Sequence, residues 1–295
     1  MLDPQHLIDA LINLGLADSR ATLKPRHGGD IHQSYALINS HGVATAFVKA
    51  NTSAARAVLT SEFESLQLMH EHVPGLYPRP LFLHDLQAPY FLAMSYHALE
   101  PVNHSTARDL GALLAAQHKV KHDRFGWPND NFIGSTQQTN SWCDRWGDFY
   151  WAKRMLPQIE LAYKNGLDSM LIGALRKLEN SVVGQLNELD ITPTLLHGDL
   201  WTGNAGYDLN NQCALLYDPA PYFGDPEVDL AMTRLFGSFP ASFYASYQAV
   251  YPQREENVNR QSLYNLYHAL NHFNLFGSSY TSMVQRCIDA WQFRR

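Results

Sequence analysis

The most informative segment of the sequence is Leu195-Leu196-His197-Gly198-Asp199-Leu200-Trp201-Thr202-Gly203-Asn204, and a related segment follows it, Leu215-Leu216-Tyr217-Asp218-Pro219-Ala220. Each segment opens with a short apolar run, which predicts a buried strand, and then delivers an acidic side chain into a polar loop. Asp199 and Asn204 stand five residues apart, and Asp218 follows the second run directly. Any one of these residues alone is well explained by a buried turn in which it caps a neighbouring helix. The ordered set of three calls for a chemical explanation.

The order and spacing match the catalytic loop of protein kinases, in which an Asp orients and deprotonates the acceptor hydroxyl and an Asn binds magnesium. The sequence therefore predicts Asp199 as the catalytic base, with Asn204 and Asp218 as ligands of Mg²⁺. Carboxylate and amide oxygens suit this hard cation, which keeps several waters and binds phosphate oxygens as well. His197 is expected to brace the loop by hydrogen bonds rather than to act on substrate.

A phosphoryl donor also needs a cation, and Ala44-Thr45-Ala46-Phe47-Val48-Lys49 reads as a strand that ends in one. This strand resembles the Val-Ala-Ile-Lys strand of protein kinases, so Lys49 is predicted to bind the α- and β-phosphates of ATP and to pair with a helix glutamate. The following helix offers Glu62 and Glu64, of which only one can face the cleft because of their angular separation on a helix. We predict Glu62, with Glu64 as the alternative.

Two further segments are candidates for nucleotide contacts. Gly28-Gly29 precedes a predicted strand and could cover the phosphates through its backbone amides, although an ordinary hairpin turn explains it equally well. The run Tyr90–Tyr96 precedes a predicted hinge, either as a plain core strand or as the purine-binding strand of a two-lobed kinase. The second interpretation places four consecutive residues at the purine, with the first as gatekeeping side chain: Met94, Ser95, Tyr96 and His97.

Composition limits the classes of protein that remain. The 295 residues are 45% hydrophobic and 17% charged, which favours a folded globular chain over a disordered one. A net charge of −6 argues against a nucleic-acid-binding surface. No apolar run approaches the roughly 18 residues of a membrane helix, and the three cysteines show no CxxC spacing. We therefore expect neither nucleic acid nor membrane as a partner, no zinc, and a cytoplasmic location.

The order of predicted elements divides the chain into a strand-rich first third and a helical remainder. We predict an α+β fold with residues 1–97 as an N-terminal lobe, residues 98–295 as a helical C-terminal lobe, and a hinge near residues 95–101. Predicted strands cover 34–39, 45–50, 81–83, 90–96, 194–196 and 214–217. Predicted helices cover 3–16, 54–72, 105–120, 141–165 and 168–189, and continue from about 226.

The motifs quoted above resemble those of the fructosamine kinase family, also called ketosamine kinases. Two later segments extend the likeness, Gly224-Asp225-Pro226-Glu227-Val228-Asp229-Leu230-Ala231-Met232 and Tyr267-His268-Ala269-Leu270-Asn271-His272-Phe273. The likeness runs in order from about residue 24 to residue 280. It implies a protein-kinase-like two-lobed fold and MgATP-dependent phosphorylation of a sugar hydroxyl on a ketosamine. It also implies that phosphorylation at the third carbon makes the adduct labile, so that the amine is released and protein deglycation results.

Carried over by position, the resemblance implies that Asp199 is the base, that Asn204 and Asp218 bind the metal, and that Lys49 binds ATP. The glycine-rich segment departs from the family pattern, because Asp30 stands where a cysteine is common. Regulation by a thiol in this loop therefore has no basis in this chain.

Three residues are candidates for contact with the acceptor, whether it is a small or a protein-bound ketosamine. Trp201 could stack on the sugar or pack the catalytic loop. Glu227 and Asp229 could open a helix, orient the catalytic loop, or meet the substrate amine. Two other functions stay open: a phosphotransferase for aminoglycosides or amino alcohols, and a pseudokinase scaffold. The sequence does not indicate an oligomeric state.

Overall fold

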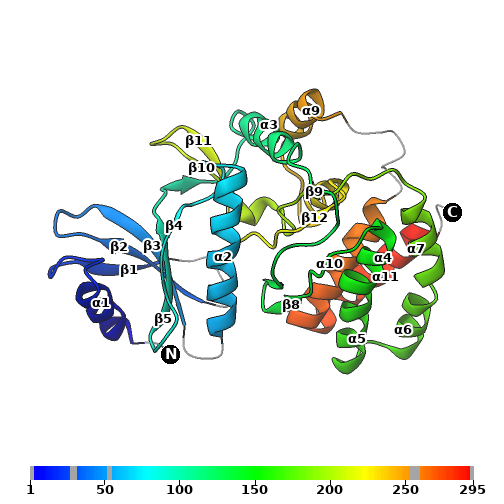
Figure 1. Ribbon diagram of the computed structural model, residues 1–295, viewed down its shortest axis with the longest axis horizontal. Coiled ribbons are helices and arrows are strands. Elements are labelled where there is room, and N and C mark those ends of the chain that lie inside the picture. Colours follow the sequence, from blue (N-terminus) through cyan, green and yellow to red (C-terminus); the bar gives the residue numbers. More distant parts are fainter. Residues whose placement is uncertain (1–2, 27–31, 52–54, 253–259, 293–295) are drawn as a thin grey trace. The chain divides into compact units, whose positions relative to one another are not determined.

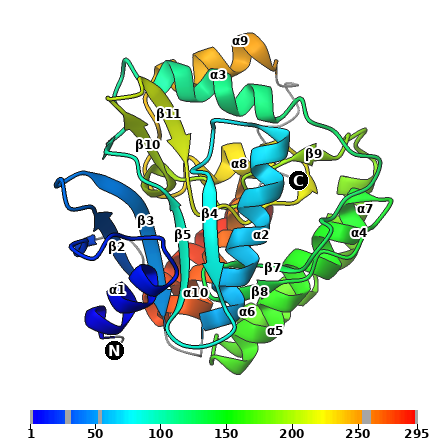
Figure 2. The same ribbon diagram turned by 60° about the vertical axis from the view of Figure 1, so that its left-hand side comes forward.

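The computed structural model describes residues 3–26, 32–51, 55–252 and 260–292, which form two compact units (Figures 1 and 2). The first unit comprises Met1–Glu100 and Gly206–Tyr217, and the second comprises Pro101–Ala205 and Asp218–Arg295. The chain therefore passes from one unit to the other three times.

An antiparallel sheet of five strands forms the first unit, in the order β1-β2-β3-β5-β4. The strands are β1 (Thr22–Arg26), β2 (Gln33–Ile38), β3 (Ala44–Asn51), β4 (Pro80–His84) and β5 (Tyr90–Ser95). Helices α1 (Pro4–Asn13) and α2 (Arg56–His72) lie on opposite faces of this sheet (Figure 1). Asp3 caps α1 by accepting the Gln5 amide at 2.9 Å.

Alternation along β3 determines what each face of the sheet presents. Ala46, Val48 and Ala50 are buried in the cluster that contains Leu7 and Leu11 of α1. Because side chains alternate along a strand, Lys49 points to the opposite face, the face that α2 covers. The strand pattern thus buries a lysine without placing it in the apolar cluster.

A second, three-stranded sheet joins β6 (Leu99–Glu100) to the hairpin of β10 (Ala205–Asp208) and β11 (Cys213–Leu216). Residues 206–217 group with the first unit, whereas the sequence analysis assigned them to the C-terminal lobe. The physical reason is a long-range pairing, in which Tyr207 lies opposite Glu100 and Asp208 opposite Leu99. Leu216 also donates its amide to the Leu76 carbonyl at 2.8 Å.

The second unit is mostly helical, around a central helix α10 (Gln261–Phe276) that packs against α5, α8 and α11. Its other helices are α3 (Ala107–Gln117), α4 (Trp146–Tyr150), α5 (Leu156–Lys164), α6 (Ser169–Arg176), α7 (Glu179–Asn187), α8 (Glu227–Met232), α9 (Ala241–Val250) and α11 (Thr281–Gln292). Two short antiparallel pairs complete it, β9 (Thr194–Leu195) with β12 (Phe223–Gly224), and β7 (Asn131–Ile133) with β8 (Thr136–Gln138). Among the described helices, none combines the length and apolar character needed to cross a bilayer.

Several predicted elements differ from those observed. The helix expected over 141–165 begins at Trp146 and contains a π-helical turn at Trp151–Met155, and the helix expected over 168–189 is split into α6 and α7. Strand β1 was not predicted because Pro25 interrupts its pattern, and its position at the sheet edge tolerates a residue that cannot donate to the ladder.

Helices α3 and α9 approach so closely that a methyl group on Gly111 would lie 2.2 Å from the Phe243 carbonyl oxygen. Gly111→Ala is therefore expected to lower the free energy of unfolding by about 1–3 kcal/mol, in spite of the better helix propensity of alanine. Gly173→Ala in α6 is the matched control, since no atom lies within 4 Å of its added methyl group. Guanidinium denaturation measures both, and equal effects of the two changes would contradict the close approach.

Candidate active site

The loop after β9 turns sharply at Gly198, where only glycine fits. Gly198 has φ +83°, and a Cβ at this position would lie 2.0 Å from the Ala220 carbonyl oxygen. Ala220 in turn donates its amide to the His197 carbonyl at 2.8 Å. The two polar loops of the second unit, one carrying Asp199 and the other Asp218, are thereby held against each other.

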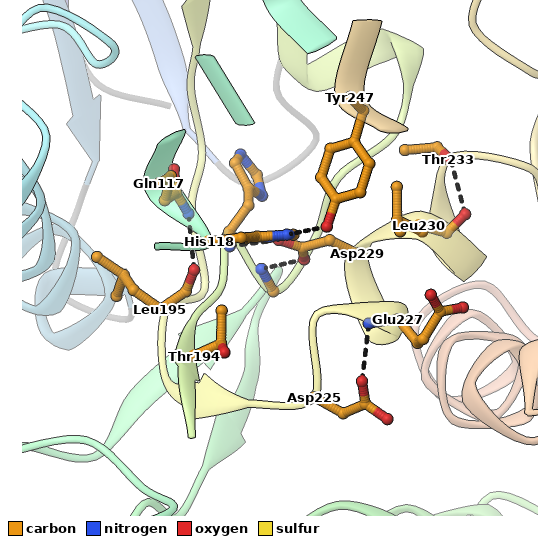
Figure 3. Close-up of polar contacts among 12 residues, drawn as sticks. Gln117, His118, Thr194, Leu195, Asp225, Glu227, Asp229, Leu230, Thr233 and Tyr247 are labelled. Atoms are coloured by element: carbon orange, nitrogen blue, oxygen red, sulfur yellow. Dashed lines mark hydrogen bonds and ion pairs between the residues drawn. The ribbon is translucent and has the colours of Figure 1, made fainter. Parts of the chain in front are cut away.

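A buried carboxylate, Asp229, holds the same turn (its side chain is labelled in Figure 3). Its Oδ2 accepts the amide of His197 at 2.7 Å and its Oδ1 accepts the amide of Gly198 at 2.9 Å. Burial acts to raise the pKa of Asp229, but the hydrogen bond and charge of His118, with a smaller contribution from His197, outweigh it and lower that pKa. An ionised carboxylate therefore fixes two consecutive backbone donors of the loop.

Residues of two helices, α3 and α9, position Asp229 itself (Figure 3). His118, at the end of α3, places Nε2 3.1 Å from Asp229 Oδ2 and Nδ1 2.7 Å from the hydroxyl of Tyr247 on α9. His118 and Asp229 are 0% and 1% exposed, so water does not compete for these bonds. The neighbouring Gln117 donates to the Leu195 carbonyl at 3.3 Å. Sequence analysis left the role of Asp229 open, and its contacts are those of an orienting residue.

Asp199 and Asn204 lie together at the tip of this loop. The Asn204 amide nitrogen donates to the Asp199 carbonyl at 2.9 Å and to its Oδ2 at 3.3 Å. Asp199 also donates its backbone amide to His197 Nδ1 at 3.1 Å, a bracing bond of the kind predicted for His197. Burial and then the charge of Asp218 raise the pKa of Asp199 to about 7, although Asn204 acts in the opposite direction. A carboxyl group with a pKa near neutrality is suited to general-base catalysis.

Asp218 contributes a second carboxylate, from backbone with φ +54°. Non-glycine residues in this region cost of order 1–3 kcal/mol and cluster at functional sites, although aspartate tolerates it better than most. The donor set that these loops offer a cation is therefore two carboxylates and one amide. Within the described ranges, no three His, Cys, Asp or Glu side chains group as an all-protein metal cage. Magnesium fits such a sparse set, since it retains waters and binds phosphate oxygens.

In the first unit, Lys49 Nζ lies 2.6 Å from Glu62 Oε1, and both side chains are about nine-tenths buried. Of the two adjacent glutamates considered from sequence, Glu62 thus forms this ion pair. Gly28 and Gly29, predicted to cover the phosphates, lie outside the described residues.

Of the four residues predicted at the purine, Met94 and Ser95 end strand β5, and Tyr96 and His97 follow it. Met94 is 4% exposed and lies opposite Phe47 of β3, and Ser95 lies opposite Ala46. The Tyr96 hydroxyl accepts a hydrogen bond from Arg26 at 2.8 Å. The side chains of Ser95 and His97 bond to each other at 2.9 Å, a contact that sequence reasoning missed.

The two remaining acceptor candidates differ in exposure. Trp201 is 36% exposed and meets Phe236 edge to face at 6.1 Å between ring centroids. A Cβ on Gly203 would lie 2.3 Å from the indole, so the missing side chain gives the ring its place. Glu227 is buried at the start of α8, and its amide donates to Asp225 Oδ1 at 3.0 Å (Figure 3). Trp201 is therefore the better placed of the two to meet a ligand.

Comparison with protein families identifies the chain, because the fructosamine kinase model matches residues 8–292. The chain belongs to the fructosamine kinase family. It is thus a phosphotransferase that acts on a hydroxyl group, with a protein-kinase-like fold of an antiparallel N-terminal lobe and a helical C-terminal lobe.

Individual relatives agree with this assignment. A probable ketoamine kinase of Synechocystis sp. is 37% identical over 266 residues, which cover 88% of this chain and 87% of that protein. The chloroplastic protein-ribulosamine 3-kinase of Arabidopsis thaliana is 38% identical over 249 residues, covering 82% and 74%. The crystal structure of a "putative fructosamine-3-kinase" from Thermobifida fusca has TM-score 0.83 at 27% identity, covering 92% and 94%. A choline kinase of Streptococcus pneumoniae, at TM-score 0.66 and 14% identity over 98% and 99%, shares the fold.

The support that α3 gives to the kinase loop can be tested with His118→Phe. This change removes the side-chain bond of His118 to the buried Asp229 carboxylate and leaves that carboxylate the two loop amides, so we expect the free energy of unfolding to fall by about 3 kcal/mol. Hydrogen exchange at the Gly198 amide should accelerate as well. His122→Phe is the control, because His122 is exposed and stacks on Trp142 at 4.3 Å. Unchanged Gly198 protection in His118→Phe would contradict the proposed support.

The raised pKa of Asp199 predicts a pH-dependent stability in metal-free protein. Because the folded-state pKa lies above the unfolded one, this group stabilises the fold fully below about pH 4, and that contribution is lost as pH rises through about 7. Asp199→Asn removes this titrating group. The free energy of unfolding of the variant, relative to that of the wild type, should therefore increase by about 2 kcal/mol between pH 5 and pH 8. Denaturation with a chelator present measures this gain. A constant difference across that range would contradict the raised pKa.

Proposed function

We propose that this kinase transfers the γ-phosphoryl group of MgATP to a sugar hydroxyl of a ketosamine, either a fructosamine or a ribulosamine. The observation that carries the proposal is the loop pair of the second unit, where Asp199, with a pKa near 7, is bonded to Asn204 and lies within the field of Asp218. The names of the ketoamine and ribulosamine kinases among its relatives support this class of acceptor.

In this proposal each residue has one task. Asp199 accepts the proton of the acceptor hydroxyl. At the same time the hydroxyl oxygen bonds to the γ-phosphorus, and the bond from that phosphorus to the ADP oxygen breaks. Asn204 and Asp218 hold Mg²⁺, which when bound neutralises charge on the phosphates. Lys49, held by Glu62, binds the α- and β-phosphates, with Gly28 and Gly29 as the covering turn. The backbone of residues 94–97 binds the purine edge.

The electrostatics of the free site are consistent with this assignment. The charge of Asp218 helps to raise the pKa of Asp199. A divalent cation between the loops would offset that repulsion, leaving Asp199 ionised and able to accept a proton at neutral pH.

The exposed indole of Trp201, two residues from Asp199, is our candidate for stacking on the sugar. Phosphorylation at the third carbon would make the adduct labile and release the amine, which constitutes protein deglycation. The three cysteines are all free thiols, which fits the reducing cytoplasm in which we place this repair activity.

An acceptor panel tests the function. With MgATP, we expect phosphate transfer to fructosyl- and ribulosyl-amines, followed by mass spectrometry. Asp199→Asn should lower the rate by about 10²–10⁴-fold, the usual contribution of a general base. Asp123→Asn, an exposed position, is the control and should leave the rate unchanged.

Two outcomes would contradict the proposal. Transfer to an aminoglycoside or to choline, but to no ketosamine, would assign the enzyme a different acceptor. Full transfer by Asp199→Asn would remove Asp199 as the base.

A further inference from the structure

A hairpin of the first unit is inserted between the two proposed metal ligands. Asn204 precedes the segment Gly206–Tyr217 by two residues, and Asp218 follows it directly. The chain therefore leaves the second unit just after one ligand and returns to it at the other. Whatever fixes this hairpin also restrains the backbone that carries both ligands.

A relay of three side chains ties the hairpin to the end of strand β5. Ser95 Oγ lies 2.9 Å from His97 Nε2, and His97 Nδ1 lies 2.8 Å from Asp208 Oδ2. An ionised carboxylate can only accept, so His97 Nδ1 donates to Asp208, and the other ring nitrogen, Nε2, is the one bonded to the serine hydroxyl. The Arg79 amide completes the set by donating to Ser95 Oγ at 2.9 Å.

Asp208 serves both the relay and the turn of the hairpin. Its Oδ1 accepts the amides of Asn210 and Asn211 at 2.9 and 3.2 Å, and its Oδ2 accepts the Asn211 side chain at 2.7 Å. The carboxylate is 1% exposed, and the His97 side chain is 18% exposed. Burial acts to raise the pKa of Asp208, but the hydrogen bonds of Asn211 and His97 outweigh it and lower that pKa. One buried anion thus determines both the shape of the turn and its attachment.

We propose that His97 is a positioning residue that couples the purine-binding segment to the metal ligands through Asp208 and the β10–β11 hairpin. The inference rests on the proposed function, which assigns the purine to residues 94–97 and Mg²⁺ to Asn204 and Asp218. Two hydrogen bonds in series link Ser95 of strand β5 to Asp208, and the single strand β10 leads from Asp208 back to Asn204. In this proposal a displacement of residues 94–97 is transmitted to Asn204 and Asp218 by side chains that contact neither the nucleotide nor the metal ion.

His97→Leu tests the coupling, because leucine keeps apolar bulk and removes both bonds. Calorimetry measures the affinity for ADP with and without Mg²⁺, which needs no acceptor. We expect the affinity for MgADP to fall about tenfold, the effect of roughly 1.4 kcal/mol. The affinity for metal-free ADP should fall less, so that the increase in ADP affinity that Mg²⁺ produces becomes smaller in the variant. His97→Gln, which can restore one hydrogen bond, should recover part of this Mg²⁺-dependent increase in affinity.

His84→Leu is the matched control. His84 is also partly buried in the first unit, where Nδ1 bonds the Pro89 carbonyl at 2.8 Å and the ring stacks on Phe91. It should lower thermal stability without changing the gain from Mg²⁺. A role of His97 in stability alone would make the two variants behave alike, which would overturn the inference. So would a folded His97→Leu with MgADP affinity within about twofold of wild type, below the effect of one hydrogen bond.

A second variant keeps the coupling testable, and the behaviour of the wild-type protein separates this inference from the proposed function. If His97→Leu fails to fold, Ser95→Ala removes the far bond of the relay and should weaken MgADP about threefold; an unchanged affinity would overturn the coupling. Wild-type protein that binds MgADP but phosphorylates no ketosamine would refute the acceptor and leave the coupling standing. Wild-type protein that fails to bind MgADP would overturn both.

Discussion

One buried carboxylate, Asp229, determines the geometry on which the rest of the site depends. Its two oxygens accept two consecutive amides of the catalytic loop, so the loop cannot rotate without losing charge-assisted bonds in a place that water does not reach. Gly198 makes the turn possible, and His118 keeps the carboxylate ionised and oriented. The direction in which Asp199 leaves the loop is therefore set by residues from α3, α8 and α9.

That rigidity allows an unfavourable arrangement of charge to persist. Burial and then the charge of Asp218 raise the pKa of Asp199, and Asp218 has left-handed backbone. Folded proteins retain such strain where the surroundings determine the local structure completely. In the proposed mechanism Asn204 and Asp218 would hold a magnesium ion, whose charge would offset this repulsion and leave Asp199 ionised as the base.

Local pattern predicted the elements that carry their own signal. The apolar runs ending in Asp199 and Asp218 and the strand ending in Lys49 could be found from local pattern. Helical geometry limited the partner of Lys49 to either Glu62 or Glu64, and the structure shows that it is Glu62. The pairs His118–Asp229 and His97–Asp208 could not be found in this way, because their members are 111 residues apart and each resembles an ordinary polar residue in its own segment. The β7–β8 hairpin did carry a sequence signal that was overlooked, because a glycine, Gly134, stands between its two strands. In the structure this glycine has the positive φ of a tight turn.

In the function that we propose, Lys49 and three oxygen-bearing side chains, those of Asp199, Asn204 and Asp218, act on one nucleotide. A crystal structure with Mg²⁺ and a non-hydrolysable ATP analogue tests it most directly. We expect oxygens of Asn204 and Asp218 to lie about 2.1 Å from the ion, with Lys49 Nζ on the α- and β-phosphates of the same molecule. An ion bound elsewhere, or a triphosphate that Lys49 does not contact, would contradict it.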